Sequence, residues 1–191
     1  MNKITLSLFF IVLTSVSYSQ TTNCCFGVRF GIGTDLSPGI SYKAEFDFRL
    51  ADNFDIGALF LATSSLKSWN SGTHDYTEKR RVYFYGAIGT WLIHYRPEEA
   101  KLYYLLSAGG GIFYYDLQKS SSTDGLLGTP LPGGGSRQSI FVNQLSIVAI
   151  PGVGHSFKSP FGLRFEVPLL IPIDNGVGVV PLFQLTAGIE F

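Results

Sequence analysis

The stretch Ile40–Leu50, ISYKAEFDFRL, alternates without exception between apolar and polar side chains. Its apolar positions are Ile40, Tyr42, Ala44, Phe46, Phe48 and Leu50, and its polar positions are Ser41, Lys43, Glu45, Asp47 and Arg49. On a helix this pattern would scatter charge around the whole circumference, whereas on a strand it separates an apolar face from a charged face. The stretch therefore predicts a β-strand.

The same alternation recurs in three other parts of the chain. Apolar residues occupy every second position in 26–32, 161–169 and 183–191, and the positions between them hold glycine, a few large charged residues and, toward the chain end, Pro168, Gln184 and Thr186. That mixture suits a narrow barrel interior, where glycine leaves room for a neighbouring arginine or glutamate. In an outer-membrane barrel the apolar face contacts lipid and the charged face points inward, whereas a soluble lipocalin-like barrel has the reverse arrangement.

Composition favours the membrane arrangement. The 191 residues are 46% hydrophobic but only 15% charged, compared with about 25% charged in an average soluble domain. The 14 basic residues balance the 14 acidic residues, so no strong field exists to attract nucleic acid. After the first 19 residues no apolar run approaches 18 residues, which excludes membrane-spanning helices and leaves a barrel as the membrane option.

Eight strands are predicted, so the expected fold is all-β, an eight-stranded antiparallel up-and-down transmembrane β-barrel. The predicted strands cover residues 25–33, 39–50, 54–63, 81–95, 102–115, 139–157, 161–171 and 178–191. The longest connections, 64–80 and 116–138, are the third and fifth, which fits long extracellular loops alternating with short periplasmic turns. The sequence does not assign inward and outward positions in the fourth and fifth strands. Pro151 predicts a bulge, a break or a turn within the sixth.

The amino-terminal residues 1–19 are predicted to be a signal peptide. They contain Lys3, an apolar core from Leu6 to Leu13, and small residues at Ser17 and Ser19, the positions read by signal peptidase. Residues 20–191 are then the barrel domain, exported to the cell outer membrane. Because the only two cysteines, Cys24 and Cys25, are adjacent, we expect no disulfide framework.

The polar faces predict a network of charges inside the barrel. Tight turns after Leu50 and before Phe161 set Arg49 opposite Asp55 and place Glu166 beside Gly152. The predicted network contains Arg29, Lys43, Glu45, Asp47, Arg49, Asp55, Arg164, Glu166 and Glu190. Because eight strands enclose just enough space for side chains, we expect a filled interior and no open pore.

Together, the signal peptide, the eight alternating strands and the final strand ending in an aromatic residue resemble the small outer-membrane β-barrel proteins of the OmpA/OmpX-like class. The resemblance implies that the last strand carries the signal read by the barrel-assembly machinery, at Phe183, Leu185, Ala187, Ile189 and Phe191. Proteins of this class have structural, adhesive, solute-passage or lipid-modifying roles, so the resemblance alone does not fix the function.

A lipid A-modifying enzyme would need a serine, a histidine and a carboxylate close together at the outer leaflet. His74 lies at the right end, in the third connection near Asp75, Ser64 and Ser65, whereas His94 and His155 lie at the periplasmic end. The histidines and cysteines lack metal-ligand spacing, and the glycine runs at 109–111 and 133–135 precede no helix that could make a phosphate loop. We therefore predict no enzymatic activity and no catalytic, cofactor or metal site.

The sequence thus predicts an integral outer-membrane barrel with a structural or surface-interaction role. Its partners would be outer-membrane lipid, the barrel-assembly machinery and an extracellular ligand bound through 64–80 and 116–138, with no nucleic acid. A narrow, porin-like solute channel, a lipid A-modifying enzyme and a soluble periplasmic lipocalin-like barrel remain as alternatives. Trp91, Tyr95, Tyr103 and Tyr104 flank the fourth connection and are predicted to form an aromatic girdle, although plain packing would explain them equally well.

Overall fold

The computed structural model describes residues 26–35, 39–51, 53–71, 74–93, 102–123, 136–157, 160–173 and 177–190. The predicted signal peptide, Cys24, Cys25, His94, Tyr95 and Phe191 lie outside these residues. None of the described residues is helical, and no helix among them is long and apolar enough to cross a membrane.

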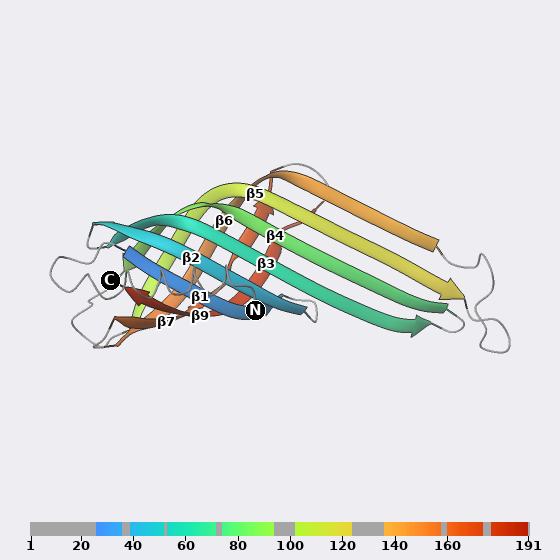
Figure 1. Cartoon of the computed structure of the whole chain (residues 1–191), viewed down its shortest axis with the longest axis horizontal. Helices are drawn as coiled ribbons and strands as arrows, with labels where there is room; N and C mark the ends of the chain where they lie inside the picture. The colour runs from blue at the N-terminus through green and yellow to red at the C-terminus, as the bar shows by residue number, and fades with distance from the viewer. Residues whose placement is uncertain are drawn as a thin grey trace, which may run out of the picture.

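The described strands close into one antiparallel ring (Figure 1). From β1 to β6 each strand pairs with the next in the chain, β7 and β8 each pair with β6 and β9, and β1 pairs with β9 to complete the ring. The predicted all-β, eight-stranded, up-and-down arrangement is confirmed. The strands are β1 (Phe26–Asp35), β2 (Gly39–Ala51), β3 (Phe54–Ser71), β4 (His74–Ile93), β5 (Leu102–Thr123), β6 (Ser136–Ser156), β7 (Phe161–Glu166), β8 (Leu169–Pro172) and β9 (Val180–Glu190).

The short strands β7 and β8 together form one member of the ring. Both pair with β6 and β9 in an unchanged register, so the interruption at Val167–Pro168 inserts no residue. Pro168 has no N–H to donate, but its carbonyl accepts a hydrogen bond from Leu182 N at 2.8 Å. Val167 N donates to the carbonyl of Pro151 at 2.9 Å. Pro151 itself stays in β6 opposite Leu106, so it makes neither a bulge nor a turn.

The register also sets the strand tilt. Where the ladder is interrupted at Pro168 and beyond Asp35, the register of the flanking pairs gives the facing residue. Followed from strand to strand, the facing residues lead from Asp55 of β3 once around the ring and return to β3 at Ser65, ten residues further along. The residues passed on the way are Thr90, Ser107, Ile150, Pro168, Leu182, Asp35 and Gly39. With a rise of about 3.3 Å per residue and a strand spacing of about 4.8 Å, this stagger gives a tilt of about 40°. The ring is therefore a narrow, strongly tilted barrel.

Alternation sorts the side chains into an apolar exterior and a buried interior. In β2, Lys43, Glu45 and Asp47 are buried, whereas Phe46 and Phe48 are exposed. The structure also assigns β4 and β5, for which the sequence pattern was ambiguous. The buried inward side chains of these two strands are Val82, Phe84, Ile88, Thr90, Leu92, Tyr103, Leu105, Ser107, Phe113 and Leu117.

A four-stranded sheet projects beyond the ring (Figure 1). The prediction of loops over 64–80 and 116–138 is wrong for most of these residues: β3 continues to Ser71, β4 begins at His74, β5 continues to Thr123 and β6 begins at Ser136. Cross-strand contacts hold this sheet, including the stacked rings of Trp69 and Tyr76, whose centroids are 5.4 Å apart. Its strands lack regular apolar alternation, which is why the pattern did not predict them.

Candidate functional site

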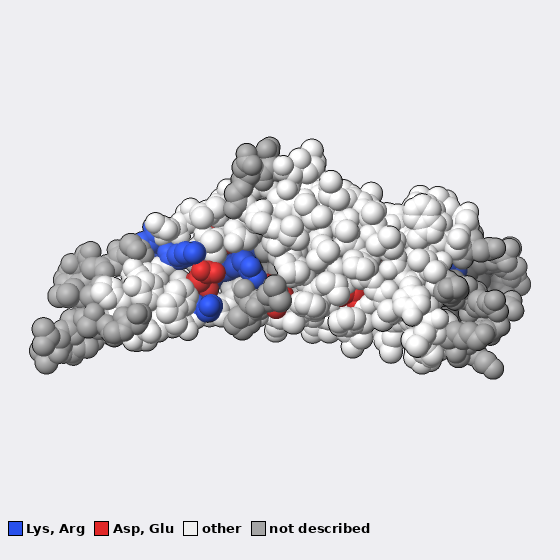
Figure 2. All heavy atoms as spheres, turned by 180° about the vertical axis from the view of Figure 1, so that it is seen from behind, with Lys and Arg blue, Asp and Glu red and all other residues white. Residues whose placement is uncertain are grey.

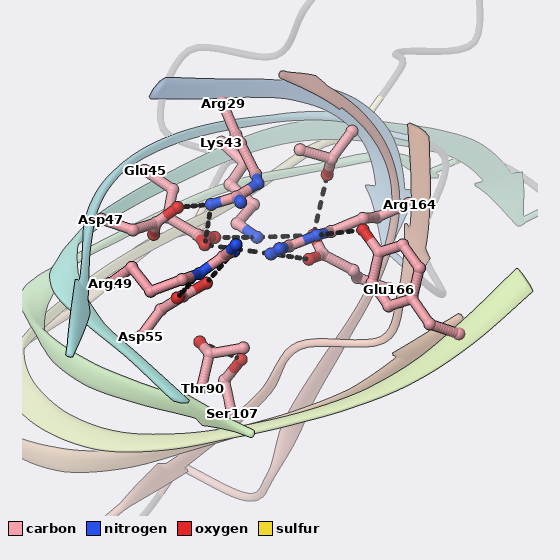
Figure 3. A network of polar contacts seen from close by, with 12 residues as sticks. Arg29, Lys43, Glu45, Asp47, Arg49, Asp55, Thr90, Ser107, Arg164 and Glu166 are labelled. Carbon is pink, nitrogen blue, oxygen red and sulfur yellow. Dashed lines mark hydrogen bonds and ion pairs between the residues drawn. The ribbon is translucent and has the colours of Figure 1, made fainter. Parts of the chain in front are cut away.

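The barrel interior contains a cluster of ion pairs between strands that are not neighbours (Figure 3). Lys43, from β2, donates through Nζ to Glu166 Oε2 of β7 at 2.5 Å. The same ammonium group contacts Glu45 of its own strand. All three side chains are almost completely buried. Because β1 and β9 lie between β2 and β7 in the ring, the pair ties two separate parts of the wall together across the interior.

Two arginines complete the cluster. Arg164, from β7, donates through Nε to the Tyr103 hydroxyl at 3.0 Å, and its Nη1 lies 3.4 Å from Glu45 Oε1. Arg29, from β1, contacts Asp47 and lies 3.4 Å from the same Glu45 oxygen. The Glu45 carboxylate thus contacts three cationic side chains, and their positive charge compensates for its burial away from water.

Neutral polar groups extend the cluster toward one end and an ion pair extends it toward the other. Thr186 donates to Glu166 at 2.8 Å, and Gln184 donates to Ser41 at 2.7 Å. Toward the turn between β2 and β3, Arg49 Nε donates to Asp55 Oδ1 at 2.9 Å. The Arg49 side chain is 21% exposed, whereas that of Asp55 is 3% exposed. This pair therefore forms the solvent-accessible end of the network.

The structure brings eight of the nine predicted network residues into the interior: Arg29, Lys43, Glu45, Asp47, Arg49, Asp55, Arg164 and Glu166. Glu190 pairs through its backbone with Gly27, and its side chain lies outside the described residues. The sequence placed Tyr103 in the exterior aromatic girdle, but this residue is buried beside Arg164 and belongs to the network. The sequence feature that could have indicated this position is Gly154. This glycine pairs with both Tyr103 and Arg164, and the tyrosine ring occupies the space that a larger side chain at 154 would need.

The other part of the interior is apolar. Its buried side chains come from β3, β4, β5, β6, β8 and β9: Leu59, Leu61, Val82, Phe84, Ile88, Phe113, Val148, Ile150, Leu170, Val180 and Leu182. Together with the ion pairs, these side chains pack the interior on both sides, as expected for so narrow a barrel.

The residues considered for lipid A chemistry do not converge. His74 pairs with Ser71 at the far end of β3, and its ring stacks near Tyr76 with centroids 6.1 Å apart. Ser64 is opposite Arg81, seven positions from Ser71, or about 23 Å along the strand. Ser65 points inward and is buried, whereas the Asp75 carboxylate is bonded to Asn70 at 2.7 Å. These residues lie in strands and not in the flexible loop that was predicted.

No metal site is found within the described ranges, because no three histidine, cysteine, aspartate or glutamate side chains there lie close enough to share an ion.

The residues proposed as an assembly signal lie along β9. Leu185 and Ala187 are exposed, and Phe183 and Ile189 are partly exposed. They alternate with Gln184 and Thr186, which are fully buried. The described members of the set therefore form one outward-facing row beside the β1–β9 closure.

Comparisons with known proteins reveal similarity in fold and none in sequence. No protein-family model and no curated protein sequence matches the chain. The solved structure of Ail, the attachment invasion locus protein of Yersinia pestis, aligns with a TM-score of 0.50 at 11% identity, covering 87% of this chain and 97% of that one. Neisserial surface protein A aligns with a TM-score of 0.50 at 12% identity, covering 87% and 96%. The predicted resemblance is thereby confirmed at the level of architecture: the fold of this chain is that of the small eight-stranded outer-membrane β-barrels.

Proposed function

We propose that the protein is an integral outer-membrane β-barrel with a structural or surface-interaction role, whose projecting sheet is the contact surface outside the cell. The observation that carries the proposal is the outer face of β2. From Ile40 to Leu50 every outward residue is apolar, and all of them except Ala44 are clearly exposed. Ten residues at about 3.3 Å rise and about 40° tilt span roughly 25 Å along the barrel axis, the height of the apolar band in outer-membrane barrels.

The distribution of charge supports the same placement. Seen from behind, the surface of the ring is nearly free of charge, and charged side chains gather where the projecting sheet leaves it (Figure 2). By register, the sheet face continuous with the interior carries Lys67, Glu78, Arg80 and Lys119. A bilayer accepts the uncharged surface and excludes the charged one, so the sheet would stand in water.

The projecting sheet has features of a binding surface. Beyond Ser65 on one side and Ser146 on the other, the outer edges of β3 and β6 pair with no strand among those described. Unpaired edges can add an extended segment of another chain through main-chain hydrogen bonds. Trp69 and Phe141 are also exposed on this sheet, at 41% and 61%. The packed interior supports a structural or interaction role more than solute passage.

The proposal is tested by cysteine labelling of intact cells with a membrane-impermeant maleimide, in a Cys24→Ser/Cys25→Ser background. Ser68→Cys places a thiol on the exposed outer face of the projecting sheet, and we expect rapid labelling. Asn53→Cys, in the exposed turn between β2 and β3, is the matched control at the opposite end, and we expect labelling only after the outer membrane is opened.

Fractionation of the same cells completes the experiment. The chain should be found in the outer-membrane fraction and shift in electrophoretic mobility on heating. Recovery in the soluble periplasmic fraction would overturn the membrane assignment. Labelling of Asn53→Cys and not Ser68→Cys on intact cells would instead show that the projecting sheet points into the periplasm.

A further inference from the structure

The outward face of β4 carries two basic residues just above an aromatic row. Arg80 points inward, because it contacts Asp35, which is itself buried, so its neighbours Lys79 and Arg81 point outward. The next outward position toward the ring is Tyr83, whose ring contacts Tyr114 with centroids 5.6 Å apart. Tyr114 in turn contacts Phe141 at 4.7 Å. Aromatic rows of this kind mark the boundary between lipid and water.

Neither Lys79 nor Arg81 has an ion-pair partner among the described residues. The outward carboxylates of this sheet are Asp75 and Asp116. Asp75 is bonded to Asn70, and Asp116 accepts hydrogen bonds from Gln118 at 3.2 and 3.4 Å. Asp116 lies directly opposite Arg81 in the β4–β5 register, but no ion pair joins the two side chains. With Arg137, which faces outward further from the ring, this face carries three cations and two carboxylates. The outer face therefore has a net positive charge, and two of its three cations lie next to the aromatic row.

We propose that Arg81 and Lys79 form a binding site for the phosphate headgroup of a lipid in the outer leaflet. The inference rests on the proposed membrane location and adds a ligand to it. Ser64, exposed on β3 directly opposite Arg81, supplies a hydroxyl donor beside the guanidinium. Guanidinium, ammonium and hydroxyl groups together match the oxygens of a phosphate.

The surface below the two cations accommodates the rest of such a lipid. Toward the ring, the outward positions of β3 alternate small residues with large ones, and those of β4 are two tyrosines followed by an alanine. Ala62 is opposite Tyr83, Phe60 is opposite Tyr85, and Ala58 is opposite Ala87. All of these side chains are uncharged and face outward, so acyl chains can lie along them while the phosphate stays at the level of Arg81. A free anion would gain nothing from this apolar strip.

The test uses the full chain in nanodiscs of phosphatidylcholine containing a small fraction of diphosphorylated lipid A. Mass spectrometry measures the lipid A retained per barrel. An Arg81→Gln/Lys79→Gln variant should bind lipid A about 25-fold more weakly, since each basic residue near a membrane surface contributes about a fivefold preference for anionic lipid. The matched control, Lys67→Gln/Lys119→Gln, removes the same charge from the opposite face of the sheet and should retain lipid A like the unmodified chain.

Other outcomes separate the competing explanations. Equal retention by the two variants would overturn the site. Displacement of lipid A by millimolar inorganic phosphate would overturn the lipid in favour of a free anion, and undiminished retention of lipid A without phosphates would overturn the headgroup contact. A chain that shifts on heating but does not enrich lipid A would refute this site and leave the membrane assignment intact. A chain found in the soluble fraction of cells would refute the membrane assignment itself.

Discussion

The barrel interior has two parts that are filled by different kinds of side chain. On β1, β2 and β7, the inward positions hold charged residues such as Lys43, Glu45 and Arg164 beside small ones such as Gly27 and Gly162. On β3 to β6, the inward positions hold residues such as Leu59, Phe84 and Phe113. Both parts are buried to a similar degree, so burial alone does not decide which kind of residue fills a barrel.

The difference shows how each part depends on its neighbours. A buried charge is tolerated only with partners in good geometry, so removing one member of the charged part should harm the others. An apolar side chain depends on filled volume, and its loss should cost only the lost contacts and the cavity. The charged part should therefore be more strongly coupled than the apolar part, and substitutions can test this.

The largest effect is expected from Glu45→Gln. The substitution removes the charge that faces Lys43, Arg29 and Arg164, and leaves buried cations in excess. We expect the free energy of unfolding to fall by about 3–5 kcal/mol. Urea unfolding in lipid vesicles, followed by the fluorescence of Trp69 and Trp91, measures it.

The matched control is Glu78→Gln, at the partly exposed pair with Lys119, where the oxygen and nitrogen lie 3.3 Å apart. That variant should lose less than about 1 kcal/mol. Equal losses in the two variants would contradict the view that the interior charges are held by mutual compensation.

A smaller loss is expected from Leu182→Ala in the apolar part. Leu182 is fully buried, so its truncation should cost about 2–4 kcal/mol, a loss insensitive to salt. Leu66→Ala, on the exposed outer face of the projecting sheet, serves as the control and should change the free energy of unfolding by no more than about 0.5 kcal/mol. A salt-dependent loss at Leu182 would show that the two parts of the interior are electrostatically coupled.

The same contrast explains what could be predicted from the sequence. Strands with one charged face, such as 40–50 and 161–166, alternate visibly, and their inward residues were predicted. In β4 and β5 both faces are apolar, because one meets the exterior and the other meets the interior core, so alternation carries no signal there. The projecting sheet was missed for the opposite reason: both of its faces are largely polar. Its pairing depends on cross-strand contacts that a single sequence does not display.

The last prediction concerns a neutral polar pair that lies between the two parts. The hydroxyls of Thr90 and Ser107 are 2.7 Å apart and almost completely buried, on neighbouring strands (Figure 3). Thr90→Val keeps the shape but leaves the Ser107 hydroxyl without its partner, which should cost about 1–2 kcal/mol. The double variant Thr90→Val/Ser107→Ala removes both groups and should recover part of that loss, because no buried hydroxyl is then left unsatisfied. Additive losses in the double variant would mean that the two hydroxyls contribute independently of each other. The pair would then behave like the apolar part of the interior, where stability depends on filled volume, and not like the charged part, where it depends on partners.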